Sequence, residues 1–376
     1  MALIQYLTRI QFEAGAVSLL SDELRLLGVS RPLVVTDKGI VAAGLLATVL
    51  AKSGLQPDTA VFDDTPENPT EAAAHQAVEL FRTAGCDSIV AVGGGSAIDL
   101  GKAVSLLTTH SGPLERYAAI LGGVDRIGAN KPPVVAVPTT AGTGSEVGRA
   151  ALLTLEDGRK LGFISPHMIP SAAICDPELT LGLPPYLTAA TGMDAITHCI
   201  ETFLSPRFNP VADAIALDGL ARAMRWLEIA TSNGSDATAR REMMMAALQG
   251  GLTFQKGLGA VHSLSHPLGG LKSVKLHHGT LNAVLLPAVL RYNAVGSEEK
   301  YARIRAAMGL SELADISAEM AKFSQRLGLP ATLGQMGVTA DCFDQIAQHA
   351  VQDHSTASNP RPVSAHDFRQ ILEDSL

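Results

Sequence analysis

The sequence has little charge, few aromatic residues and no basic cluster. Charged residues make up 18% and aromatic residues 4% of its 376 residues, and the formal net charge is −8. Proteins that bind nucleic acid or anionic membranes need a positive surface, so this composition excludes both partners and favours small-molecule ligands. The charged fraction also falls below the roughly 25% typical of soluble proteins, which predicts that some surface is buried in a homo-oligomer, a dimer or larger.

Long apolar runs and paired cysteines are also missing. The sequence has no run of about 18 apolar residues, the length that a membrane span requires. Its first residues, MALIQYLTRIQFEAGAV, lack a basic start followed by an apolar segment and a cleavage site, so we expect a soluble, cytoplasmic protein. The cysteines, Cys86, Cys175, Cys199 and Cys342, show no CxxC spacing and support neither a disulfide framework nor a thiolate metal site.

The hydrophobic pattern differs between the two halves of the chain. From about residue 30 to about residue 140, β-branched runs such as PLVVT and SIVAV alternate with helical patterns such as EAAAHQAVELFRTAG, as in a parallel sheet covered by helices. Later segments such as AIALDGLARAMRWLEIA repeat every 3.6 residues and show few strand signals. We therefore predict an α/β domain over residues 1–180 and an all-helical domain over residues 181–376, divided near DPELTLGLPP.

A glycine-rich loop follows one of the predicted strands. The strand ends at Val92, Gly93–Gly95 follow, and a predicted helix begins near Ser96. Glycines let the backbone approach a ligand, and the amide groups at a helix N-terminus favour an anion such as pyrophosphate. The loop does not match GxGxxG, because Ile98 stands where the third glycine is needed. A tight structural turn is the alternative interpretation of these glycines.

A second polar loop, PTTAGTGSEV at residues 138–147, also follows an apolar strand. Its hydroxyl groups can hold the same ligand from the other side, which favours a dinucleotide. Asp37 comes just after another strand, where a carboxylate can accept hydrogen bonds from the adenosine ribose and repel a 2′-phosphate. This position favours NAD over NADP, whereas the same aspartate acting only as a helix N-cap would indicate no ligand.

Acidic and histidine side chains recur at helical spacing in the second half. Asp194 and His198 lie four residues apart on a predicted helix, so they share one face. His262 and His266 have the same spacing, and residues 277–278 supply a further imidazole. One aspartate and three histidines suit a divalent ion such as Fe²⁺ or Zn²⁺ and leave a position for substrate. Each histidine alone is equally explained as a core or interface residue, so the pattern leaves open which of them bind metal.

Several motifs of the chain resemble those of the iron-containing, or group III, alcohol dehydrogenases. These motifs are GGGSAIDLGK, PTTAGTGSEV, ATGMDAITHCIE and GLGAVHSLSHPLGG followed by HHGTLNAVLLP, and the likeness extends from about residue 4 to about residue 360. The resemblance implies a Rossmann-like NAD-binding α/β domain followed by an all-helical metal-binding domain, in the architecture of dehydroquinate synthase.

The resemblance also implies roles for individual residues. The implied metal ligands are Asp194, His198, His262 and His278. The segment between HPLGG and HG is about two residues longer than in many members, so His277 remains an alternative to His278. His266 is implied to be a catalytic residue beside the metal, near substrate and nicotinamide. The implied cofactor-binding residues are Asp37, Asn68, Gly94, Gly95, Ser96, Asp99, Thr139, Thr140, Thr143 and Lys160.

The implied activity is a metal-dependent interconversion of a primary alcohol and its aldehyde with NAD. The segments YLTRIQFEAGAVSLL and DPELTLGLP are similar to the 4-hydroxybutyrate dehydrogenase branch, which interconverts 4-hydroxybutyrate and succinate semialdehyde. Lys272 and Lys275 either pair with the substrate carboxylate or are ordinary solvated lysines. The alternatives are a broad-range primary alcohol or 1,3-propanediol dehydrogenase, a dehydroquinate-synthase-like lyase, a maleylacetate-reductase-like enzyme and an inactive nucleotide-binding protein.

Overall fold

The computed structural model describes residues 4–376, which form two compact units. The N-terminal unit holds Tyr6–Thr140 and Ser145–Gly182. The C-terminal unit holds Leu183–Leu376, residues 4–5 and the short segment Ala141–Gly144. Four residues of the second polar loop therefore belong to the C-terminal unit, although they follow a strand of the N-terminal one.

The N-terminal unit is built on a six-stranded parallel sheet with the strand order β1-β8-β5-β4-β2-β3. The strands are β1 (Arg9–Phe12), β2 (Pro32–Val35), β3 (Val61–Phe62), β4 (Ser88–Gly93), β5 (Val134–Pro138) and β8 (Ala172–Cys175). The strands β2, β4 and β5 are neighbours and parallel, so the loops that follow them all leave the sheet from the carboxyl ends of its strands. The predicted Rossmann-like α/β architecture is confirmed.

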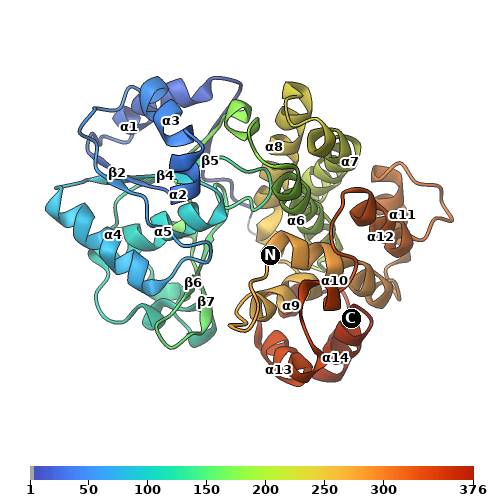
Figure 1. The fold of residues 1–376 in the computed structure, drawn as a ribbon. Coiled ribbons are helices and arrows are strands. Elements are labelled where there is room, and N and C mark those ends of the chain that lie inside the picture. The colour runs from blue at the N-terminus through green and yellow to red at the C-terminus, as the bar shows by residue number, and fades with distance from the viewer. Residues whose placement is uncertain (1–3) are drawn as a thin grey trace. The chain divides into compact units, whose positions relative to one another are not determined.

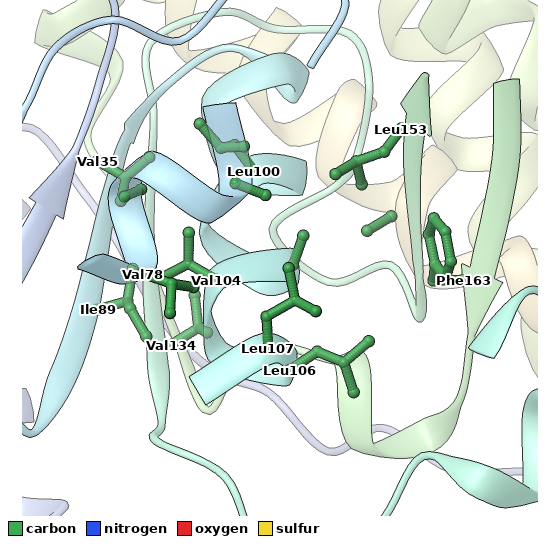
Figure 2. Packing of buried hydrophobic residues seen from close by; sticks show 14 of the residues in the cluster. Val35, Val78, Ile89, Leu100, Val104, Leu106, Leu107, Val134, Leu153 and Phe163 are labelled. Carbon is green, nitrogen blue, oxygen red and sulfur yellow. The ribbon is translucent and has the colours of Figure 1, made fainter. Parts of the chain in front are cut away.

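Helices cover both faces of this sheet (Figure 1). They are α1 (Leu20–Leu26), α2 (Lys38–Ala42), α3 (Leu45–Ser53), α4 (Glu71–Thr83) and α5 (Gly95–Thr109). Successive side chains of a strand point to opposite faces of the sheet. Val35 and Ile89 belong to the core that contains residues of α4 and α5 (Figure 2), whereas Val34 and Val90 belong to the core that contains residues of α1 and α3. Burial on both faces explains why β2 and β4 are uninterrupted apolar runs.

The sequence pattern did not predict every strand of this unit. An antiparallel pair, β6 (Ala150–Thr154) and β7 (Lys160–Ile164), follows the second polar loop, and β1 and β8 complete one side of the main sheet. Each has at most five residues, and β8 has the sequence AAIC, which is poor in the β-branched residues that mark strands. The segments β1 and β8 are strands because they pair with segments distant in the sequence, and a local sequence pattern does not predict such pairing.

Among its described residues, the C-terminal unit contains helices and connecting segments and no strand. Its helices are α6 (Pro185–Leu204), α7 (Pro210–Ser232), α8 (Ala237–Leu252), α9 (Ala260–Leu268), α10 (His278–Asn293), α11 (Glu298–Ala307), α12 (Ile316–Arg326), α13 (Phe343–Gln352) and α14 (Ala365–Glu373). Every residue of α6 from Thr188 onward is buried, so α6 is the central helix of the unit. Across residues 4–376, no helix combines the length and apolar character that crossing a membrane would require.

Candidate metal and cofactor sites

One face of the central helix α6 carries the start of the candidate metal site. Asp194, His198 and Glu201 follow one another at intervals of four and three residues, which places them on the same side of the helix. All three are at least 97% buried. Burying a charged or polar side chain costs free energy unless it is hydrogen-bonded or paired with an opposite charge. The partners of these three side chains therefore define the candidate site.

Two glycines let the helices α9 and α10 come close to α6. A Cβ atom added to Gly279 would lie 2.2 Å from the carbonyl oxygen of Ala190, so only glycine permits this approach next to His278. A Cβ atom added to Gly259, the N-cap of α9, would lie 2.9 Å from Oε1 of Glu201. These approaches bring the first turns of α9 and α10 against the polar face of α6.

The four predicted metal ligands converge on one carboxylate oxygen. Oδ1 of Asp194 lies 3.2 Å from Nε2 of His198, 3.5 Å from Nε2 of His262 and 3.7 Å from Nε2 of His278. Ligand atoms bonded tetrahedrally at about 2.1 Å lie about 3.4 Å apart, which matches these three spacings to Oδ1. The ligand atoms of Asp194, His262 and His278 also all lie within 4.8 Å of one another, so these three form the core of the candidate site, with His198 beside Asp194.

The same atoms surround one polar donor. Nδ2 of Asn282 lies 2.7 Å from Oδ1 of Asp194 and 3.2 Å from Nε2 of both His262 and His278. One amide nitrogen thus faces three atoms whose lone pairs point inward. A divalent cation satisfies converging lone pairs better than one amide group does, so the donor set fits a metal ion.

Burial opposes charge on Asp194, His198 and His262. Burial raises the pKa of Asp194, but the nearby His198, His278 and His262 outweigh it and hold that pKa far below its usual range. Burial lowers the pKa of His198 to about 4. Burial also lowers the pKa of His262, but hydrogen bonds with Asp194 and Glu201 reverse the shift and raise it to about 9. The site therefore keeps an ionised carboxylate whose charge a cation can neutralise.

Glu201 is a site residue that the sequence did not reveal. Its Oε2 accepts a hydrogen bond of 2.6 Å from Nδ1 of His262, and its Oε1 accepts one of 2.7 Å from the backbone N–H of Val261. Nδ1 is therefore the nitrogen that donates to Glu201, and Nε2 is the nitrogen that faces Asp194 and that a cation would bind in place of a proton. The only local signal was that Glu201 lies seven residues after Asp194, on the same helix face.

Replacing Glu201 with Gln should weaken metal binding by about 10- to 100-fold, because an amide does not hold Nδ1 of His262 in the donor form as a carboxylate does. Competition with a chromogenic chelator would measure the dissociation constant. Glu242→Gln is the matched control, since this carboxylate on α8 is also buried but pairs with Arg222 and Arg241. Equal metal affinities for Glu201→Gln and the unaltered protein would contradict the assignment.

The remaining histidines of this region separate by their contacts. The ring of His266 stacks on that of His278, with centroids 5.7 Å apart and planes 8° apart, and its Nδ1 donates to Oδ2 of Asp353 at 2.8 Å. The ring of His277 lies edge-on to Tyr186, with centroids 6.4 Å apart. Between His277 and His278, the geometry therefore favours His278 as the ligand. His266 lies beside the ligand set.

In the N-terminal unit, the glycine-rich loop begins where β4 ends. Gly93 has φ +152°, and a Cβ atom there would lie 2.7 Å from that of Ala97, so no other residue fits without strain. Gly94 is the N-cap of α5 and Gly95 is its first residue. A Cβ atom on Gly94 would touch the Thr140 side chain at 3.4 Å. Packing within the chain therefore requires glycine at position 93, and the N-terminus of α5 that follows favours an anion such as a phosphate.

Two further predicted cofactor residues lie beside Gly93. The backbone N–H of Thr139 donates to the carbonyl oxygen of Gly93 at 3.0 Å, which joins the ends of β4 and β5. Oδ2 of Asp37 lies 3.4 Å from the Cβ position of Gly93, while its Oδ1 caps α2 by accepting from Ile40 N–H at 3.0 Å. Asp37 is therefore a helix N-cap whose second oxygen faces the glycine-rich loop.

The other predicted cofactor residues have internal partners or lie elsewhere. The hydroxyl of Ser96 donates to the carbonyl oxygen of Glu67. Lys160 donates to Oδ1 of Asn68 at 2.9 Å, which brings these two predicted residues together. Thr143 belongs to the C-terminal unit.

Asp99 helps to hold the second polar loop. Its carboxylate accepts hydrogen bonds from the hydroxyl of Ser145 and from the N–H of Leu152. Lys102, which the sequence did not single out, is fully buried one turn later and donates to Ser145 and to the carbonyl oxygens of Gly148 and Ala150. These bonds fix residues 145–152 against α5.

Known proteins resemble the chain over its full length. Residues 8–177 match the family model "Iron-containing alcohol dehydrogenase", and residues 188–376 match the model of that family's C-terminal domain. The 4-hydroxybutyrate dehydrogenase of Cupriavidus necator is 57% identical, with all of both chains covered. A crystal structure of 1,3-propanediol oxidoreductase is 38% identical and superposes with a TM-score of 0.93, again over all of both chains. Sulfoacetaldehyde reductase from Bifidobacterium kashiwanohense, solved in complex with NAD⁺, is 26% identical with a TM-score of 0.89, over 100% of this chain and 98% of that one.

Proposed function

The chain belongs to the iron-containing alcohol dehydrogenase family, and we propose that it interconverts 4-hydroxybutyrate and succinate semialdehyde with NAD. The convergence of three imidazole nitrogens on Oδ1 of Asp194 is the observation that carries the reaction class. Similarity to the Cupriavidus enzyme supports the choice of substrate. The family match removes support for the dehydroquinate-synthase-like lyase.

Asp194, His198, His262 and His278 would hold the metal, which we propose to be Fe²⁺, with Zn²⁺ as the alternative. NAD would bind the N-terminal unit, with its pyrophosphate at the backbone N–H groups of residues 94–96 and its adenosine ribose at Asp37. The other predicted cofactor residues, Asn68, Asp99, Thr139, Thr140, Thr143 and Lys160, keep that role as part of the proposal.

When bound, the divalent ion stabilises negative charge on the alcohol oxygen, and NAD accepts the hydride. The chain's own residues must then bind the ion, exclude water and remove the hydroxyl proton. Phe254 lies edge-on to His198, with ring centroids 4.8 Å apart, and shields that side of the site from water. His266 is the proposed proton acceptor, through Nε2, because its Nδ1 already donates to Asp353.

We also propose that the enzyme is a cytoplasmic homodimer or larger oligomer. The supporting observations are the low charged fraction of 18% and exposed apolar side chains such as Phe208, Val295 and Leu313, which are 77%, 69% and 97% exposed. Light scattering would give the mass of the particle, and a monomer at micromolar concentration would contradict this part of the proposal.

NADH formation by protein loaded with Fe²⁺ or Zn²⁺ tests the substrate. The panel is 4-hydroxybutyrate, 1-butanol, 1,3-propanediol and ethanol. The first two share a four-carbon chain, so their ratio of kcat/KM isolates the carboxylate. We expect 4-hydroxybutyrate to be preferred. A clear preference for the neutral alcohols would overturn the hydroxy-acid assignment, leave the dehydrogenase intact, and favour the 1,3-propanediol alternative that the 38% identical crystal structure suggests.

The two lysines near the histidines give no further support to carboxylate binding. Lys272 and Lys275 are exposed, in the segment between α9 and α10. Exposed cations bind a carboxylate weakly because water screens the charge. The choice of 4-hydroxybutyrate therefore rests on similarity and not on these residues.

A further inference from the structure

Residues 353–359, between α13 and α14, run along α9 in the opposite direction and contact it at regular intervals. Oδ1 of Asn359 accepts from the N–H of Ala260 at 3.1 Å. The hydroxyl of Thr356 donates to that of Ser263 at 2.7 Å, and Asp353 accepts from His266. We call residues 353–359 the strap. Each step of three residues along the strap thus meets a step of three residues along α9. The helix α13, which precedes the strap, lies beside α9 (Figure 1).

The far end of the strap is fixed to a second helix of the site. Asn359 and Asn293 exchange hydrogen bonds of 2.8 and 3.0 Å through their side-chain amides, and both residues are buried. Asn293 is the last residue of α10, whose first residue is His278. The strap is therefore tied to α9 and α10, two of the three helices that carry the histidines of the candidate metal site, and its near end holds Asp353 in a fixed place.

The carboxylate of Asp353 is held on both of its oxygens. Oδ1 accepts a hydrogen bond of 2.8 Å from the backbone N–H of Ser355, and Oδ2 accepts the one from His266. The side chain is 12% exposed. Burial raises its pKa, but the charge and hydrogen bond of His266 and the nearby His354 outweigh burial and hold the pKa well below its usual range. Asp353 is thus an ionised acceptor, and Nδ1 of His266 must be the donor.

We propose that Asp353 is a positioning residue that fixes the ring orientation and the tautomer of His266. With the proton of the neutral ring on Nδ1, the lone pair lies on Nε2, the nitrogen that the proposed function requires as acceptor. The inference therefore rests on that function. Glu201 and His262 show the same arrangement one turn earlier on α9. One carboxylate from α6 and one from the strap thus set the two histidines of α9 for different tasks.

The test compares three variants of the full-length, metal-loaded enzyme. Asp353→Asn should lower kcat by about 10- to 100-fold, as loss of an orienting carboxylate does elsewhere, with KM and metal content within about twofold of the unaltered enzyme. Thr356→Val removes a strap contact without touching His266, so it should lose thermal stability and keep kcat within about twofold. Glu201→Gln should instead weaken metal binding, so that this variant loses bound metal whereas Asp353→Asn retains it.

A second readout does not depend on turnover. In the diamagnetic zinc-loaded protein, at a pH where the imidazoles are neutral, the ¹⁵N shifts of His266 report which nitrogen carries the proton. We expect Nδ1–H in the unaltered protein and a mixed or Nε2–H form in Asp353→Asn. The inference is overturned by an Nε2–H form in the unaltered protein, or by unchanged kcat in Asp353→Asn.

Two other outcomes have distinct meanings. A loss of one bound metal equivalent in Asp353→Asn would show that His266, Asp353 and His354 hold an ion of their own, since their ligand atoms lie within 4.8 Å of one another, and would also overturn the positioning role. If the unaltered enzyme oxidises no alcohol yet shows the tautomer change on substitution, the proposed function fails and the positioning role of Asp353 stands.

Discussion

Asp194→Asn is expected to lower kcat/KM by at least about 10³-fold, with most of the bound metal lost. A bound ion supplies several kcal/mol of stabilisation to the charge on the alcohol oxygen, and about 1.4 kcal/mol corresponds to each factor of ten in rate. Asparagine has nearly the same shape, so the change removes the negative charge without creating a cavity. Elemental analysis of the purified variant and steady-state kinetics would measure both effects.

The matched control is Asp218→Asn on α7, which removes the same charge from a half-exposed side chain that pairs with Arg222. This variant should keep its metal and its activity. Full metal content together with unchanged turnover in Asp194→Asn would show that Asp194 is not a ligand.

His266→Ala is expected to lower kcat by about 10²- to 10⁴-fold while the metal is retained, because general acid–base catalysis contributes rate accelerations of that size. The ring of His266 stacks on His278 but is bound to Asp353, which is consistent with a role beside the metal. Metal analysis and kcat, measured on the same preparation, would show whether His266 is a proton acceptor or a metal ligand.

His277→Ala is the control for that experiment, since its ring lies in the same region but packs against Tyr186. It should keep both metal and kcat, whereas His278→Ala should lose metal. Equal loss of metal and activity in His266→Ala would make His266 a ligand. Metal loss in His277→Ala alone would reverse the choice between the two neighbouring histidines.

Sequence patterns predicted the parts of the fold that depend on local order. β2 and β4 are continuous apolar runs because both faces are buried, and α4 has an apolar stripe and the N-cap Thr70. β8 is only four residues long and is a strand because it lies between β1 and β5. Its identity depends on hydrogen bonds with segments more than 30 residues away, which a window of sequence does not contain.

The residues of the candidate metal site also include some that a local sequence pattern reveals and some that it does not. Asp194 and His198 were predicted because their spacing matches one helix turn, which is a local property. The partnerships of Glu201 with His262 and of Asp353 with His266 join residues 61 and 87 positions apart. No periodicity connects such pairs, so the sequence could suggest Asp194 and His198 as ligands but could not reveal the carboxylates that hold His262 and His266.

The ligands of the candidate site come from α6, α9 and α10, three helices well separated along the chain. An ion bound there acts as a removable cross-link, and it has no comparable site in the unfolded chain. At an ion concentration 100 times its dissociation constant, such binding adds about 2.7 kcal/mol to the stability of the fold. Copies that lack metal would therefore unfold and be degraded first, so that metal supply would set how much of the protein persists as well as how fast it works.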